Sequence, residues 1–198
     1  FRSTIAAMDC TLSANSATEG GAIFAGNAST VTTTNCWMAA NTAAWGGAVF
    51  VADDSIITAT DCTMVSNSAD SHGGALFATA NSSITVTHCS MASNNATRGG
   101  GAVAAERKST VNATGCTMTL GDAGWGGALY VRHSSVVTAS NCWMISNCAT
   151  LGGAVYTKEF SVVTATDCTL SYNSADMGGA VYTKEFSVVT TTDCTLAD

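Results

Sequence analysis

The cysteines of this 198-residue chain recur at an almost constant interval, and this interval constrains the fold more than any other feature. Eight of the nine cysteines are separated by 26, 26, 27, 27, 26, 26 and 26 residues: Cys10, Cys36, Cys62, Cys89, Cys116, Cys142, Cys168 and Cys194. Glycine pairs keep the same period, from Gly20-Gly21 to Gly178-Gly179, and an asparagine follows most of the cysteines by five residues. A repeat of this length over the whole chain predicts a solenoid, in which each unit packs only against its neighbours.

The residues within one repeat favour strands over helices. The stretch 161–170 (SVVTATDCTL) is β-branched and alternating, and 152–156 (GGAVY) is short and begins with glycines. No segment carries a helical apolar stripe. We therefore predict an all-β fold, a right-handed single-stranded parallel β-helix of about seven coils of 26–27 residues. It is expected to form one domain over residues 1–198 and to be a fragment of a longer repeat array, because the chain opens and closes within a repeat.

Equivalent positions of successive repeats are expected to stack into columns. The positions predicted to face inward are Val137, Val163 and Val189, then Ala139, Ala165 and Thr191, and also Met64, Met118, Leu170, Val49, Leu76 and Val155. The asparagines are expected to form a ladder of side-chain amides that satisfies buried polar groups. The glycine pair is expected to supply a positive φ or a close approach at a corner. The segment before the serine of each repeat varies freely, which predicts an exposed loop.

Charge and hydropathy exclude several classes of function. The net charge is −7 with only seven Lys plus Arg, so we expect no nucleic-acid partner, which would require a clustered basic face. No apolar run approaches the roughly 20 residues of a membrane-spanning helix, so no membrane-spanning segment is expected. One cysteine per repeat without a Cys-x-x-Cys pair or a matched histidine is a poor metal site, and we expect neither a metal nor a cofactor.

Threonines stand four and two residues before the cysteines and are the first candidate binding surface. The candidate residues are Thr32, Thr34, Thr58, Thr60, Thr85, Thr87, Thr114, Thr138, Ser140, Thr164, Thr166, Thr190 and Thr192, with Asn112 in the remaining position. If both columns point outward, their side chains are spaced about 4.8 Å between coils and roughly 6.7 Å along the strand. Such a flat grid is similar to the Thr-x-Thr arrays of antifreeze solenoids. The alternative is that threonine simply suits outward strand positions, and the first repeat breaks the grid with Ala6 and Met8.

The cysteine column is interpreted mainly as buried thiols that act as small core residues. Stacked cysteines about 4.8 Å apart lie within the range of a disulfide, although parallel side-chain vectors are unfavourable for one. Cys148 falls in a different column, otherwise occupied by polar residues, and is predicted to be an exposed free thiol or an intermolecular link.

Carboxylates and aromatics complete the candidates. Asp9, Asp61, Asp167 and Asp193 precede their cysteines, but they recur with the repeat and single out no coil as a catalytic cleft. Phe24, Phe50, Phe77, Tyr130, Tyr156 and Tyr182 form one column, interrupted by Ala104, which is either core or a sticky outer stripe. Sequons for N-glycosylation occur at Asn27, Asn81, Asn95 and Asn112, of which the first two lie in the variable loop.

The repeat motifs resemble a known family. Gly-Gly-Ala-Ile at 20–23 and Leu-Ser-Ala-Asn at 12–15 recur along the chain, with Met or Leu where that family has Phe and with an added cysteine. These motifs are similar to the repeats of chlamydial polymorphic outer membrane proteins, which also occur in large adhesin-like proteins. The resemblance implies a β-helix and a secreted or surface-displayed passenger used in adhesion.

Three functional interpretations follow. The first is an extracellular or cell-surface structural repeat protein, non-catalytic, that is adhesive or filament-forming. Its partners would be further copies of itself, end to end or side by side, or a cell-surface or glycan ligand. The second is an ice-binding protein that uses the threonine columns. The third is a polysaccharide-active β-helix enzyme.

Overall fold

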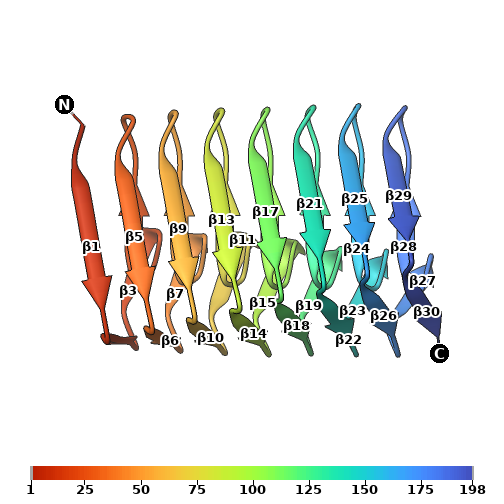
Figure 1. Cartoon of the computed structure of the whole chain (residues 1–198), viewed down its shortest axis with the longest axis horizontal. Coiled ribbons are helices and arrows are strands. Elements are labelled where there is room, and N and C mark those ends of the chain that lie inside the picture. Colours follow the sequence, from red (N-terminus) through yellow and green to blue (C-terminus); the bar gives the residue numbers. More distant parts are fainter. Residues whose placement is uncertain (1, 198) are drawn as a thin grey trace.

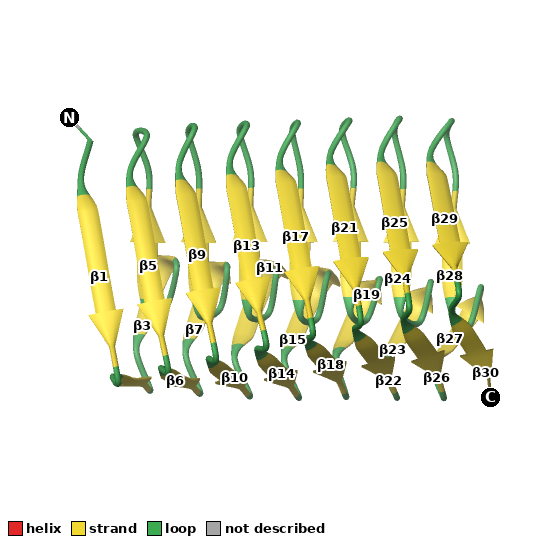
Figure 2. Cartoon of the chain, in the orientation of Figure 1, coloured by secondary structure: helices red, strands yellow, loops and turns green. Residues whose placement is uncertain are grey.

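The computed structural model describes residues 2–197, and within them every regular element is a short β-strand (Figures 1 and 2). The strands form four parallel sheets, here named A to D in the order in which one coil visits them. Sheet A contains β1 (Thr4–Met8), β5 (Thr30–Thr34), β9 (Ile56–Thr60), β13 (Ser83–Thr87), β17 (Thr110–Thr114), β21 (Val136–Ser140), β25 (Val162–Thr166) and β29 (Val188–Thr192). Sheet B contains β2 (Thr11–Ser13), β6 (Trp37–Ala39), β10 (Thr63–Val65), β14 (Ser90–Ala92), β18 (Thr117–Thr119), β22 (Trp143–Ile145), β26 (Thr169–Ser171) and β30 (Thr195–Ala197).

The other two sheets have seven strands each. Sheet C contains β3 (Ser16–Glu19), β7 (Thr42–Trp45), β11 (Ser68–His72), β15 (Asn95–Gly99), β19 (Asp122–Trp125), β23 (Cys148–Leu151) and β27 (Ser174–Met177). Sheet D contains β4 (Ile23–Ala25), β8 (Val49–Val51), β12 (Leu76–Ala78), β16 (Val103–Ala105), β20 (Leu129–Val131), β24 (Val155–Thr157) and β28 (Val181–Thr183). Seven coils of four strands are followed by β29 and β30, which begin an eighth, so the predicted parallel β-helix is confirmed.

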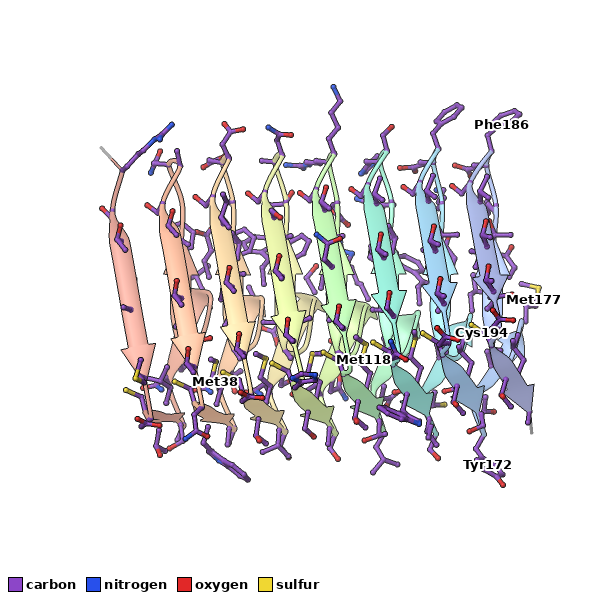
Figure 3. The ribbon with its side chains drawn as sticks, in the orientation of Figure 1. Met38, Met118, Tyr172, Met177, Phe186 and Cys194 are labelled. Atoms are coloured by element: carbon purple, nitrogen blue, oxygen red, sulfur yellow. The ribbon has the colours of Figure 1, made fainter. Side chains whose placement is uncertain are left out.

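The core is a single tube of stacked apolar side chains inside the four sheets. Most of the positions predicted to face inward are buried, among them Val137, Ala139, Met64 and Leu76. Val189 and Thr191 occupy the same columns in β29 but are less buried, because no coil of the chain covers that strand. Met38 and Met118 lie inside the coils, whereas Tyr172 and Phe186 project from bends into solvent (Figure 3). Each fully buried valine, leucine or methionine side chain stabilises the fold by roughly 1.5–3 kcal/mol.

Two polar ladders run through the corners of the coils. In the predicted asparagine ladder, the backbone N and the side-chain Nδ2 of Asn41 both donate to Asn67 Oδ1 at 3.0 Å, and the pattern repeats along the column except where Gly121 interrupts it. Each Nδ2 also donates to a carbonyl of the preceding coil, as Asn67 Nδ2 does to Met38 O at 2.9 Å. A second ladder, not predicted, links serines: Ser135 N donates to Ser161 Oγ at 3.2 Å. These bonds satisfy polar groups that the turns would otherwise bury without partners.

The glycine pair performs both of its expected roles at the corner between sheets C and D. The first glycine takes the left-handed conformation, with a φ of 63° at Gly46. The second allows close stacking, since a Cβ on Gly47 would lie 2.1 Å from the carbonyl oxygen of Gly74. Any side chain here would therefore force adjacent coils apart.

Candidate functional site

The outer face of sheet A carries the predicted threonine columns. Residues alternate along each strand: in β9, Ile57 and Ala59 are buried while Ile56, Thr58 and Thr60 face outward. The threonines pair in register from strand to strand, as Thr58 does with Thr85. All the residues proposed for this face lie on it, in two adjacent columns: Thr32, Thr58, Thr85, Thr138, Thr164 and Thr190 in one, and Thr34, Thr60, Thr87, Thr114, Ser140, Thr166 and Thr192 in the other.

This face bears no charge. The first, third and fifth residues of the eight strands of sheet A are all uncharged, although the chain contains 14 acidic and seven basic residues. The third outward column adds apolar side chains at Ile56, Val136 and Val188. From β5 to β29 the surface is therefore a regular array of mainly hydroxyl and methyl groups, carried on the strands of sheet A that lie side by side in Figure 1.

The other predicted surface residues are dispersed. Cys148 is an exposed thiol at the start of β23, and six cysteines of the main column are buried. No disulfide joins cysteines in the described residues, and burial raises the pKa of Cys36. The four sequons are exposed, but on different surfaces: Asn27 and Asn81 in loop bends, Asn95 on β15, and Asn112 within the uncharged face of β17.

The Asp column before the cysteines lies along the bend that follows sheet A. Neighbouring coils interact there only in pairs: Asn35 Nδ2 donates to Asp9 Oδ1 at 2.7 Å, and His88 Nδ1 lies 3.8 Å from Asp61 Oδ1. This bend forms a ridge of residues in the left-handed conformation, with φ near 52° at Asp9, Asp61 and Asp167. The hollows found at the surface of residues 2–197 are lined by other residues and not by these carboxylates.

The aromatic column, whose direction the sequence left open, projects outward from sheet D, and its four central rings are nevertheless buried. Phe50, Phe77, Tyr130 and Tyr156 form a second apolar cluster, separate from the core of the tube. Their rings stack on one another from coil to coil, with centroids 5.3 Å apart for Phe50 and Phe77 and 5.5 Å apart for Tyr130 and Tyr156. Trp125 covers the column from the end of β19, at 6.0 Å from the Tyr130 ring.

The column is broken where Ala104 replaces an aromatic residue, and this break creates a second candidate site. The His72 ring occupies the vacant level, stacked between Phe77 at 5.7 Å and Tyr130 at 5.1 Å. His72 reaches this position because β11 and β15 each contain five residues where other strands of sheet C have four. The extra residue shifts the register after Ala69, which aims His72 over sheet D.

Beside His72, the surface is hollowed to a volume of about 490 Å³. The hollow is lined by residues of several coils: Glu19, Trp45, Phe50, Asp70, Ser71, His72, Phe77, Thr79, Arg98, Glu106, Arg107 and Arg132. Its volume lies within the roughly 300–1,000 Å³ of small-molecule sites. It is a feature of these coils alone, since it depends on the bulge and on the missing ring.

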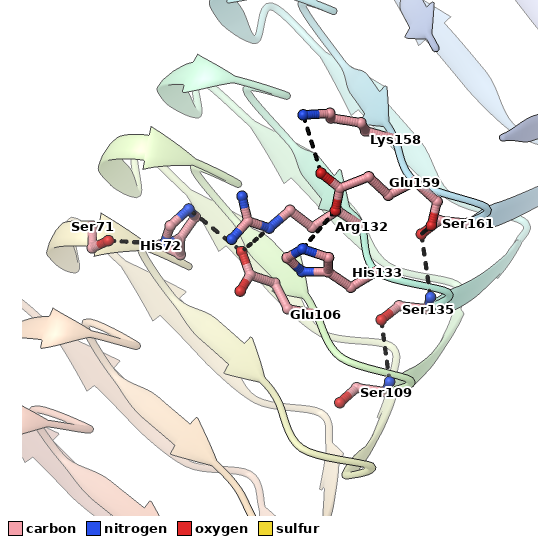
Figure 4. A network of polar contacts seen from close by, with 10 residues as sticks. All are labelled: Ser71, His72, Glu106, Ser109, Arg132, His133, Ser135, Lys158, Glu159 and Ser161. Atoms are coloured by element: carbon pink, nitrogen blue, oxygen red, sulfur yellow. Dashed lines mark hydrogen bonds and ion pairs between the residues drawn. The ribbon is translucent and has the colours of Figure 1, made fainter. Parts of the chain in front are cut away.

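A buried charge cluster forms the floor of the hollow. Glu106 Oε1 lies 2.9 Å from Arg132 Nε and 3.5 Å from His72 Nε2, and the Glu106 and His72 side chains are only 6% and 7% exposed. Ser71 Oγ lies 2.8 Å from His72 Nδ1 (Figure 4). The arrangement fits a neutral imidazole that accepts from Ser71 and carries its proton on Nε2, toward Glu106.

The electrostatics of this floor follow from burial. Burial lowers the pKa of His72 to about 4, and the nearby charges of Arg132 and Arg98 act in the same direction. Burial raises the pKa of Glu106, against the opposing effect of Arg132. The Arg132 guanidinium also lies 5.9 Å from the Tyr130 ring centroid, a cation–π arrangement that helps to fix it.

His72, Glu106 and Arg132 were not among the site residues predicted from the sequence. Two signals pointed to this region: the two 27-residue intervals that end at Cys89 and Cys116, and the interruption of the aromatic column at Ala104. Neither signal indicates which polar side chains converge, because Arg132 comes from the coil after Glu106 and His72 from the coil before it.

Two kinds of site are absent from residues 2–197. No group of three or more His, Cys, Asp or Glu side chains there is arranged to hold a metal ion. Nor does that part of the chain contain a helix long and apolar enough to cross a membrane.

Comparison with known proteins identifies the architecture. The family model described as "Right handed beta helix region" matches residues 47–198. Neither the curated proteins nor the solved structures include a match to the chain. The stacked parallel sheets and this match, which covers most of the sequence, show that the chain belongs to the right-handed β-helix family.

Proposed function

We propose that this chain is a non-catalytic, secreted or surface-displayed adhesive rod, and that the outer face of sheet A is its binding surface. The observation that carries the proposal is the absence of charge from all outward positions of that sheet, in a chain with 21 charged residues (14 acidic and seven basic). The resemblance of the repeats to polymorphic outer membrane proteins supports both adhesion and the extracellular location.

The chemistry of the face suits an extended, neutral and repetitive partner. Burying a charged side chain against a partner carries a large desolvation cost, whereas hydroxyl groups require only a matching hydrogen bond. Threonine methyl groups and the side chains of Ile56 and Val136 add apolar area between the hydroxyls. A glycan surface or a second rod placed side by side presents such a partner.

A catalytic role has less support. Hydrolysis of glycosidic bonds generally requires two carboxyl groups that face one substrate. Three carboxylates line the hollow, but Glu106 at its floor is in contact with the Arg132 guanidinium, and Glu19 and Asp70 come from β3 and β11, two coils apart.

Ice is a second candidate partner for the same face. The observation that favours it is the register of the two threonine columns from β5 to β29, which only Asn112 and Ser140 interrupt. The spacing of about 4.8 Å by 6.7 Å forms a rigid two-dimensional lattice of hydroxyl and methyl groups that can order water.

The test compares two double variants with the parent chain. Thr58→Tyr with Thr164→Tyr disrupts sheet A, and Thr63→Tyr with Thr169→Tyr makes the same changes on outward positions of sheet B in the same coils. Each protein is measured for co-sedimentation with microcrystalline cellulose and with chitin, and for thermal hysteresis and ice shaping.

Adhesion through sheet A requires that the parent and the sheet B variant co-sediment and that the sheet A variant does not. Equal binding by both variants, or no binding by the parent, contradicts the proposal. Thermal hysteresis that disappears only in the sheet A variant identifies ice as the partner.

A further inference from the structure

The hollow beside His72 is separate from the sheet A face, and arginines are concentrated around it. Three of the four arginines of this acidic chain, Arg98, Arg107 and Arg132, lie around it. They come from β15, from the bend after β16 and from the bend after β20, so only the stacking of coils brings them together. Such a concentration of guanidinium groups favours an anion.

The arginines differ in how far they are already neutralised. Arg132 Nε contacts the buried Glu106 carboxylate, which fixes the guanidinium in place. Arg98 and Arg107 are exposed, and neither comes within 4 Å of a carboxylate in the part of the chain that the structure describes. Two guanidinium groups therefore remain available to a ligand at this end of the hollow. Of the other acidic lining residues, Glu19 lies on β3, three coils before Arg98, and Asp70 lies on β11, the strand that pairs with β15.

An exposed aromatic side chain, Trp45, lies on the coil before His72. Trp45 pairs in register with His72 at the end of β7 and is 38% exposed. Its equivalent three coils later, Trp125, stacks on Tyr130 and Tyr156, whereas no ring within residues 2–197 stacks on Trp45. The Trp45 ring thus offers a free face about two coils, or roughly 10 Å, from Arg98.

From this lining we infer that the hollow binds a small organic anion in which a carboxylate is attached to a ring with a face that can pack on an aromatic side chain. Arg98 and Arg107 hold the carboxylate, and the ring packs toward Trp45. The buried His72, Glu106 and Arg132 form the floor that positions these groups. The ring is either aromatic or a sugar ring, and both sources share the same chemistry.

The test uses two carboxylates and their neutral counterparts. Binding of 4-hydroxycinnamate, 4-hydroxycinnamyl alcohol, glucuronate and glucose to the full chain is measured by titration calorimetry and by tryptophan fluorescence. We expect saturable binding of one carboxylate, at least about tenfold tighter than its neutral counterpart, because charge-assisted hydrogen bonds contribute the difference. Preference for the first or the second carboxylate distinguishes an aromatic acid from a sugar acid.

Variants locate the site. Arg98→Gln with Arg107→Gln is expected to weaken carboxylate binding about tenfold or more, and Trp45→Ala to weaken it and abolish the fluorescence change. Lys184→Gln removes a positive charge outside the hollow and serves as the matched control. Because Arg98 and Arg107 make no ion pair within residues 2–197, the Arg98→Gln, Arg107→Gln variant is expected to keep the parent melting temperature.

Three results overturn the inference: no saturable binding of either carboxylate, equal affinity for the neutral counterpart, or unchanged binding in the arginine variant. The outcome is independent of the proposed adhesion, since Thr58→Tyr with Thr164→Tyr leaves the hollow intact and is expected to bind the carboxylate normally.

Discussion

The outer surfaces of sheets A and D are built by the same repeat, yet they are opposites. On sheet A the strands have the same length in every coil, and the surface is a lattice of uncharged side chains. Over sheet D, one extra residue in β11 and in β15 and one missing ring at Ala104 gather charged side chains around a hollow. Regular stacking makes an extended surface, and a local departure from the period makes a concave site. A solenoid can thus carry two kinds of binding surface on one rod.

The largest loss of stability is expected from Glu106→Ala, a substitution at the floor of the hollow. This change leaves Arg132 and His72 beside an apolar side chain, and removal of one partner of a buried ion pair costs about 3–4 kcal/mol. Urea denaturation of the parent and the variant measures the loss. Combining it with Arg132→Ala is expected to recover part of the stability, and a purely additive double variant would show that the two side chains do not interact.

The hollow is also expected to make stability depend on pH, which the uncharged face cannot do. Unfolded His72 takes up a proton as the pH falls below about 6.5, whereas folded His72 does so only near its pKa of about 4. The stabilisation present above pH 6.5 is therefore lost as the pH falls from 6.5 to 4, by up to about 3 kcal/mol.

His72→Gln isolates this effect, since Glu106 acts in the opposite direction. The raised pKa of Glu106 favours the folded state at low pH and disfavours it as the pH rises above the ordinary value. Melting temperatures between pH 7 and 4 should fall more steeply for the parent than for the variant. Parallel curves would mean that folded His72 titrates normally.

A smaller loss is expected from Gly99→Ala, which fills space next to the broken aromatic column. The added Cβ would lie 2.6 Å from Cγ of Tyr130, whose buried ring stacks on its neighbours, so overpacking is expected to cost about 2 kcal/mol. Gly26→Ala is the matched control, because its Cβ meets Phe24, a ring that is 44% exposed and can move aside. Equal thermal shifts in the two variants would argue against a rigid column at the hollow.

The smallest effect is expected on the regular face. Thr138→Val with Thr164→Val keeps the shape and β-branching of two outward residues, so stability should change by less than about 0.5 kcal/mol. The melting temperature of this variant provides the measurement. A large shift would reveal that the threonine hydroxyls stabilise the rod itself, and would weaken their assignment to binding.

The repeat made the fold predictable from the sequence. Because each coil meets only equivalent residues of its neighbours, the period alone aligned Thr58 with Thr85 and Asn41 with Asn67. The inward valines and methionines then followed from alternation along a strand. The serine ladder was not predicted, although a serine recurs at this position in every repeat, because recurrence alone does not show whether a hydroxyl faces solvent or a buried turn.

The hollow was not predictable in the same way. Its residues are exceptions to their columns: His72 stands where the preceding coil has Trp45, and Ala104 stands where the others have a ring. The sequence shows each exception but not that the His72 ring fills the level of Ala104, because that depends on how a one-residue bulge redirects the strand. The burial of Tyr130 could not be predicted either. Its ring points out of sheet D, and the side chain that covers it, Trp125, belongs to sheet C.

The aromatic cluster over sheet D lies outside the tube, and its separation from the main core affects how the protein can evolve. Substitutions at Trp125 or Leu151 alter the cover of that cluster without changing the packing inside the coils. A lineage can therefore vary the shape and charge of one flank while the rod keeps its length and stiffness. Duplication of a coil, as in the near-identical 155–170 and 181–196, would then supply spare copies of the flank in which new pockets arise by insertion of one residue.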